Sequence, residues 1–125
     1  MAGGESETTL RRLPGWRHAF VEDDKLGYYL GAGVSGATSA RAAMFRDLLG
    51  FTRADDLRQA ILMHARTWPA VLFAERPHGP IYNVIGPMVG PNGQRMERMI
   101  TAWIIEHGTS APRNITAFPD RRRRV

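Results

Sequence analysis

The side chains that are able to do chemistry in this chain are mainly arginines, histidines and hydroxyl groups. The histidines follow no H-x-H or H-E-x-x-H spacing, and the carboxylates form no cluster of ligands, so no metal site is predicted. The absence of cysteine excludes disulfides, thiolate ligands and a cysteine nucleophile. A serine hydrolase is not indicated either, because the G-x-S-x-G motif is missing. We therefore expect neither a metal nor any other cofactor.

Cleavage of RNA without a metal is a reaction that these residue types can support. RNA carries its own nucleophile, the 2′-OH. The protein therefore has to align that oxygen with the phosphorus, stabilise negative charge on the phosphate and move protons. Arginines, a histidine and a threonine on a sheet suffice, and aromatic side chains on an open sheet face stack unpaired bases. The residue types permit this reaction but do not select it.

The basic charge of the chain is concentrated at one end. The net charge is +5, but four of the 17 basic residues are the consecutive Arg121, Arg122, Arg123 and Arg124. Without them the chain is nearly neutral, with 13 basic and 12 acidic side chains in residues 1–120. Two interpretations of the tail at 120–125 remain open: a solvated, disordered terminus, or a segment that attracts RNA phosphates.

The pattern of hydrophobic residues predicts one domain in which helices precede strands. Residues 1–12 are predicted to be disordered, and residues 13–119 have the size of a single domain with its own core. Helices are expected over 22–30, from Thr38 or Ser39 to Leu49, and over 54–67; strands are expected over 70–75, 80–89, 95–106 and 113–119. The short turns between the strands make neighbours antiparallel. We predict an α+β fold, with the N-terminal helices packed on one face of a four-stranded antiparallel sheet.

Helix 54–67 has the clearest signal. Its apolar residues recur at helical spacing from Leu57 through Ile61 to Ala65, and His64 lies on the same stripe. We therefore interpret His64 as a structural residue on the inner face of this helix.

Alternation within the strands predicts which residues lie on the open face of the sheet. The aliphatic set Ile100, Ala102 and Ile104 is expected to pack against the helices, together with Ile115 and Ala117. Thr101, Trp103, Asn114 and Thr116 would then line the open face. Pro87 predicts an edge or a bulge near the end of the second strand.

Five stretches of the chain, taken together and in order, indicate a family. They read "AFVEDDKLGYYL", "SARAAMFRDLLGF", "GPNGQ", "TAWII" and "PRNITAFP". This pattern resembles that of an uncharacterised family of small bacterial proteins whose C-terminal segment is typically "PRLVTAYP". That ending is in turn similar to the terminal strand of the barnase, EndoU, colicin and RelE-like ribonuclease toxins. The larger grouping implies the same order of helices followed by a four-stranded antiparallel sheet.

The resemblance also implies a set of site residues. Lys25, Trp103, Arg113 and Thr116 stand where the family has lysine, tryptophan, arginine and threonine, and Arg41 stands where it usually has lysine. The chain departs from the family between its first two helices, where "GAGVSGAT" replaces a histidine-proline pair.

Two functions follow as expectations. The first is a metal-independent ribonuclease of bacterial toxin type that cleaves RNA by 2′-OH attack. In it, Arg41 and Arg113 bind the phosphate, Thr116 orients the phosphate or the 2′-OH, Lys25 or His107 carries protons, and Trp103 and the arginine tail contact RNA. The alternative is a non-enzymatic protein-binding module, a partner or regulator in a toxin–antitoxin-like or defence system. A cognate antitoxin or immunity protein is expected as a partner. With neither a membrane span nor a signal sequence in the chain, we expect a cytoplasmic location.

Overall fold

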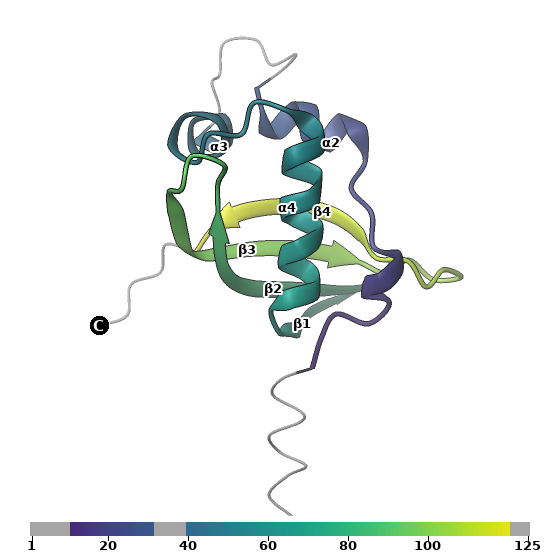
Figure 1. Ribbon diagram of the computed structural model, residues 1–125. Helices are drawn as coiled ribbons and strands as arrows, with labels where there is room; N and C mark the ends of the chain where they lie inside the picture. The colour runs from purple at the N-terminus through teal and green to yellow at the C-terminus, as the bar shows by residue number, and fades with distance from the viewer. Residues whose placement is uncertain (1–10, 32–39, 121–125) are drawn as a thin grey trace, which may run out of the picture.

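The computed structural model of the chain describes residues 11–31 and 40–120. The helices come first and a single antiparallel sheet follows, so the predicted α+β fold is confirmed (Figure 1). The elements are η1 (Trp16–His18), α2 (Asp23–Tyr29), α3 (Ala40–Ala42), the π-helical segment η2 (Ala43–Leu48), α4 (Ala54–Thr67), β1 (Ala70–Arg76), β2 (Gly79–Val89), β3 (Arg95–Ile104) and β4 (Arg113–Pro119). The predicted cap at Thr38 or Ser39, most of the predicted disordered N-terminus and the four tail arginines lie outside the described residues.

Helix α4 covers one face of the sheet and runs across its strands (Figure 1). Asp55 and Asp56 lie in its first turn, where the helix dipole favours carboxylates. Its buried residues are Leu57, Ile61, His64 and Ala65, so the apolar stripe seen in the sequence faces the core. None of the helices among the described residues combines the length and the apolar character that crossing a bilayer requires.

The sheet has the order β1-β2-β3-β4, with every neighbouring pair antiparallel. Strands β1 and β4 are therefore its edges. The register of β2 against β3 shifts between Gly86 and Met88, which confirms the irregularity predicted at Pro87. Just before this shift the ring of Trp68 lies on the backbone of Gly86, where an added Cβ would stand 2.3 Å from the Trp68 Cγ. The end of α4 is thus packed directly on the sheet.

The prediction of which β3 residues face the helices was wrong. Trp103 and Thr101 are completely buried on the helix side, and Trp103 belongs to the core with Leu57 and Ile61. The opposite set lines the open face, where Ile100 and Ala102 border a hollow. The physical reason is a polar partner on α4. The Trp103 indole N–H donates to Thr101 Oγ1 at 2.9 Å, and Thr101 Oγ1 in turn lies 2.9 Å from His64 Nδ1.

Strand β4 contains a bulge that the alternation pattern does not reveal. Ala102 pairs with Thr116 but the next residue, Trp103, pairs with Asn114, so Ile115 is the extra residue. Asn114 is therefore buried on the helix side, contrary to the prediction. Thr116 faces the open side as predicted, where it and Ile115 line the same hollow. The bulge thus turns Ile115 to the side opposite to the one expected.

Candidate functional site

A polar pocket lies where α2 and α3 meet the bulge of β4. It has a volume of about 390 Å³ and is lined by Glu22, Asp24, Lys25, Tyr28, Arg41, Ile115 and Thr116. Helix α2 and the residue that precedes it supply the carboxylates, the lysine and the tyrosine; Arg41 comes from α3. We call this cavity the Thr116 pocket. It brings two carboxylates, two cations and two hydroxyl groups to one edge of the sheet.

Arg41 is held between aromatic rings rather than by a carboxylate among the described residues. Its Nη1 lies 3.4 Å from the Tyr28 hydroxyl, and its guanidinium carbon is 5.9 Å from the Tyr28 ring centre and 6.0 Å from that of Phe118. Contact with aromatic faces orients a guanidinium without neutralising it. The positive charge of Arg41 therefore remains available to an anion in the pocket.

A buried hydrogen-bond cluster fixes the backbone beneath Thr116. The Tyr29 hydroxyl donates to Asn114 Oδ1 at 2.6 Å, and Asn114 Nδ2 donates to the carbonyl oxygens of Ala102 and Thr116, each at 3.1 Å. Burial raises the pKa of the Tyr29 phenol well above its ordinary value of 10, so the hydroxyl stays protonated and keeps donating. One asparagine thus ties α2 to the bulge and sets the position of the threonine.

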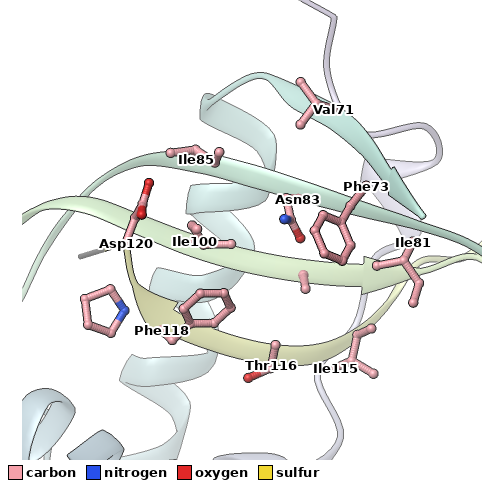
Figure 2. A pocket seen from close by; sticks show the side chains of 12 residues that line it. Val71, Phe73, Ile81, Asn83, Ile85, Ile100, Ile115, Thr116, Phe118 and Asp120 are labelled. Carbon is pink, nitrogen blue, oxygen red and sulfur yellow. The ribbon is translucent and has the colours of Figure 1, made fainter. Parts of the chain in front are cut away.

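A second, largely apolar hollow continues from the pocket across the open face of the sheet (Figure 2). Its volume is about 750 Å³, and it is lined by Val71, Phe73, Ile81, Asn83, Ile85, Ile100, Ala102, Ile115, Thr116, Phe118, Pro119 and Asp120. We call it the sheet groove. Ile115 and Thr116 line both cavities, so the Thr116 pocket opens at the β4 end of the groove. Figure 2 shows the rings of Phe73 and Phe118 within the same hollow as the Asn83 amide.

The structure brings three of the sequence-predicted site residues together. Lys25, Arg41 and Thr116 all line the Thr116 pocket. Arg113 does not line the pocket, and it forms ion pairs with Glu22 at 3.7 Å and with Glu106 at 3.1 Å. The carboxylates of Glu22 and Glu106 therefore already compensate the charge of Arg113. Glu22 also lines the Thr116 pocket, so this ion pair connects Arg113 to the pocket.

The other predicted residues lie elsewhere. His107 is exposed in the loop between β3 and β4, where its backbone N–H donates to the His78 carbonyl, and it lines neither cavity. Trp103 is in the core, so the prediction that it lies on the open face, where RNA was expected to contact it, is wrong. The reason is the inverted face of β3 described above. Arg121, Arg122, Arg123 and Arg124 lie outside the described residues.

Sequence reasoning missed Glu22, Asp24 and Tyr28 as pocket residues. Glu22 and Asp24 stand at the start of the helix expected over 22–30, where the helix dipole favours carboxylates in any protein, and Tyr28 carries no signal of its own. The spacing of Asp24, Lys25 and Tyr28 places them on one side of α2, and this was the available indication. In residues 11–31 and 40–120, no group of three or more histidines and carboxylates is arranged to hold a metal ion.

Comparisons with known proteins agree with this architecture. The chain belongs to the family described as "Domain of unknown function (DUF6883)", whose model matches residues 12–121. Curated proteins give no match. A solved structure, "Contact-dependent growth inhibition toxin - immunity protein complex from Klebsiella pneumoniae 342", contains a chain that is 17% identical and superposes with a TM-score of 0.57. The match covers 85% of this chain and 97% of that one, and at this identity it shows a shared fold.

Proposed function

We propose that this member of the DUF6883 family is a metal-independent endoribonuclease of bacterial toxin type, with its reaction centre in the Thr116 pocket. The observation that carries the proposal is the convergence of Lys25, Arg41 and Thr116 in one cavity with the Glu22 carboxylate. A general base, two cations and a hydroxyl group around one space are what RNA cleavage by 2′-OH attack requires.

The residues divide into roles by their chemistry. The Glu22 carboxylate accepts the proton of the 2′-OH as that oxygen attacks the phosphorus. The bond from phosphorus to the 5′-oxygen of the next nucleotide breaks, and the Lys25 ammonium protonates that leaving oxygen. The products are a 2′,3′-cyclic phosphate and a 5′-hydroxyl end.

Electrostatic stabilisation falls to Arg41. A guanidinium presents a planar fork of donors to phosphate oxygens and keeps its charge at all physiological pH values. The aromatic contacts of Arg41 leave this charge uncompensated by any carboxylate of the described residues. Thr116, held by the bulge beneath it, orients the phosphate or the 2′-OH.

The sheet groove supports single-stranded RNA as the substrate class. Phe73 and Phe118 offer ring surfaces for stacking, and the Asn83 amide offers both a donor and an acceptor for a base edge. Stacking on a sheet requires unpaired bases, so we propose single-stranded regions of RNA as the substrate. The similar solved structure is a complex of a toxin with an immunity protein, and this supports a role for this chain in a pair of a toxin and its cognate immunity protein.

The test is cleavage of single-stranded RNA in the presence of EDTA by the wild type and by Thr116→Val. Valine keeps the shape of threonine and removes only the hydroxyl, so we expect a loss of at least about tenfold in turnover with an unchanged melting temperature. Arg41→Gln is expected to lose about 100-fold or more, because it removes the charge opposite the phosphate. Arg53→Gln is the matched control, since Arg53 is exposed outside both cavities.

Equal cleavage by the wild type, Thr116→Val and Arg41→Gln would place the reaction outside the pocket. A cyclic phosphate end on the product distinguishes this mechanism from hydrolysis by water. No cleavage of transfer, ribosomal or messenger RNA by a folded wild type would overturn the proposal.

A protein-binding module is the second candidate, and one observation favours it. Edge strand β1 exposes three large apolar side chains in a row, Val71 at 55%, Leu72 at 52% and Phe73 at 61%. Edge strands with apolar surface are sites at which partner chains add a strand. In that case the chain is itself a partner or regulator, Leu72→Lys would abolish binding of its protein partner, and the pocket variants would leave that binding unchanged.

A further inference from the structure

Three arginines surround one tryptophan at the end of the molecule remote from the Thr116 pocket. The guanidinium carbons of Arg12, Arg17 and Arg66 lie 5.3, 4.7 and 5.4 Å from the ring centre of Trp16. Arg12 and Arg17 come from the N-terminal segment and Arg66 from the last turn of α4. The hydrogen bond from the Ala70 N–H to the Arg11 carbonyl, at 3.0 Å, ties that segment to the start of β1. We call Arg12, Trp16, Arg17 and Arg66 the Trp16 cluster.

The cluster carries positive charge that the described residues do not neutralise. The ion pairs of residues 11–31 and 40–120 involve other arginines and give Arg12, Arg17 and Arg66 no carboxylate partner. All three charges surround one ring, at separations comparable with the Debye length of about 8 Å at physiological ionic strength, so their repulsion is only partly screened. The negative end of α4 offsets part of the charge of Arg66. An anion at the cluster would relieve the remaining repulsion.

The surface around the cluster is hollowed and contains two tryptophans. A cavity of about 830 Å³ is lined by Arg12, Trp16, Arg17, Thr67, Trp68 and Pro69. The arginines are exposed and both indoles are partly exposed. Trp68 is held from beneath by the backbone of Gly86, so its orientation is fixed by the sheet. Guanidinium groups beside aromatic rings suit a ligand that carries both phosphates and bases.

The cluster and the Thr116 pocket lie at opposite ends of α4. Helix α2, which lines the pocket, is joined to the first half of α4 by the ion pair between Asp23 and Arg58. The Trp16 cluster adjoins its last turn. Figure 1 shows the purple N-terminal segment passing the end of α4 that leads into β1, with α2 at the other end. The two sites are therefore separated along α4 and share no lining residue.

We propose that the Trp16 cluster is a second binding site for single-stranded RNA, which holds the strand by phosphate contacts to the three arginines and by stacking of bases on the indoles. This site is independent of the proposed ribonuclease activity, since it uses none of the residues of the Thr116 pocket. It binds by charge and stacking, so it tolerates any base sequence.

The test compares two triple variants in binding to a short 2′-O-methyl oligouridine, which lacks the nucleophile and cannot be cleaved. Arg12→Gln/Arg17→Gln/Arg66→Gln removes the cluster charges. Arg53→Gln/Arg76→Gln/Arg95→Gln removes the same number of charges from exposed arginines elsewhere. We expect the cluster variant to raise Kd by about tenfold or more and to reduce the log–log salt slope by about 2, at about 0.7 per phosphate contact. The control is expected to keep the slope of the wild type.

Trp16→Leu separates stacking from charge. We expect it to weaken binding by about tenfold while leaving the salt slope unchanged, with the melting temperature recorded for each variant. Equal losses in the two triple variants would overturn the proposal, because binding would then follow net charge alone. Competition by polyglutamate as effective as competition by oligouridine would also overturn it, in favour of an acidic protein surface. A failure of RNA cleavage leaves these binding measurements unaffected.

Discussion

At the scale of single residues, every buried polar side-chain atom in residues 11–31 and 40–120 has a hydrogen-bond partner. His64 is the clearest case, with Nδ1 2.9 Å from Thr101 Oγ1 and Nε2 3.0 Å from the Gly86 carbonyl oxygen. A carbonyl can only accept, so Nε2 carries the proton and Nδ1 accepts from the threonine hydroxyl. Burial lowers the pKa of His64 below its ordinary value of 6.5, which keeps the ring neutral. These contacts support the structural role that the helical stripe predicts for His64.

This arrangement predicts a pH-dependent stability. Because the pKa of His64 is lower in the folded state than in the unfolded state, the unfolded chain binds a proton first as the pH falls below about 6.5. The free energy of unfolding should then decrease by up to about 1.4 kcal/mol per pH unit from this residue. His64→Gln offers an amide donor and acceptor and does not titrate, so its melting temperature should fall less steeply between pH 7 and 5. Parallel melting curves for the two proteins across this range would contradict the assignment.

At the scale of elements, the bulge of β4 is what separates a buried Asn114 from an outward Thr116. Asn114→Ala removes the acceptor of the Tyr29 hydroxyl and both amide donors to the bulge. We expect a loss of about 2 to 4 kcal/mol in the free energy of unfolding, measured with denaturant, together with a large loss of RNA cleavage.

Tyr29→Phe is the matched control for that prediction. It removes one hydrogen bond and keeps the two amide contacts that stabilise the bulge. We expect a smaller loss of stability, about 1 kcal/mol, and nearly unchanged cleavage. If Tyr29→Phe lost as much activity as Asn114→Ala, the position of Thr116 would depend on the contact with α2 and not on the bulge.

The helices and strands also show which features of the structure could be predicted from the sequence and which could not. The helical stripe of α4 and the turns between strands follow from local periodicity, so the fold class and the strand bounds were predictable. Alternation in β3 separates Trp103 from Ala102, but it does not say which set faces the helices. That depends on partners such as His64, which are distant in sequence. In β4 one extra residue inverts the alternation, so Thr116 was placed correctly and Asn114 was not. Glu22 and Tyr28 join the pocket only through tertiary packing.

At the scale of the whole molecule, most of the net positive charge is in the C-terminal tail, and the nearly neutral body adds a local concentration of positive charge at the Trp16 cluster. The tail arginines 121–124 add four charges to those of the Trp16 cluster. Deleting the tail should weaken RNA binding and reduce the salt slope by up to about 2.8, at about 0.7 per contact, without lowering the melting temperature. Fluorescence titration with the same oligouridine at several salt concentrations measures this. An unchanged slope after truncation would mean that the tail makes no phosphate contacts.

The burial of Trp103 has a consequence for observing this protein in solution. The chain has three tryptophans; the Trp103 indole is completely buried and bonded to Thr101, whereas Trp16 and Trp68 are partly exposed. In deuterated water, one indole proton resonance should therefore persist after the other two have exchanged, because its exchange requires opening of the core. That single signal reports on the integrity of the fold, while the two that vanish first belong to the surface at which we expect RNA to bind. One spectrum thus distinguishes a variant that has lost its ligand from one that has lost its structure.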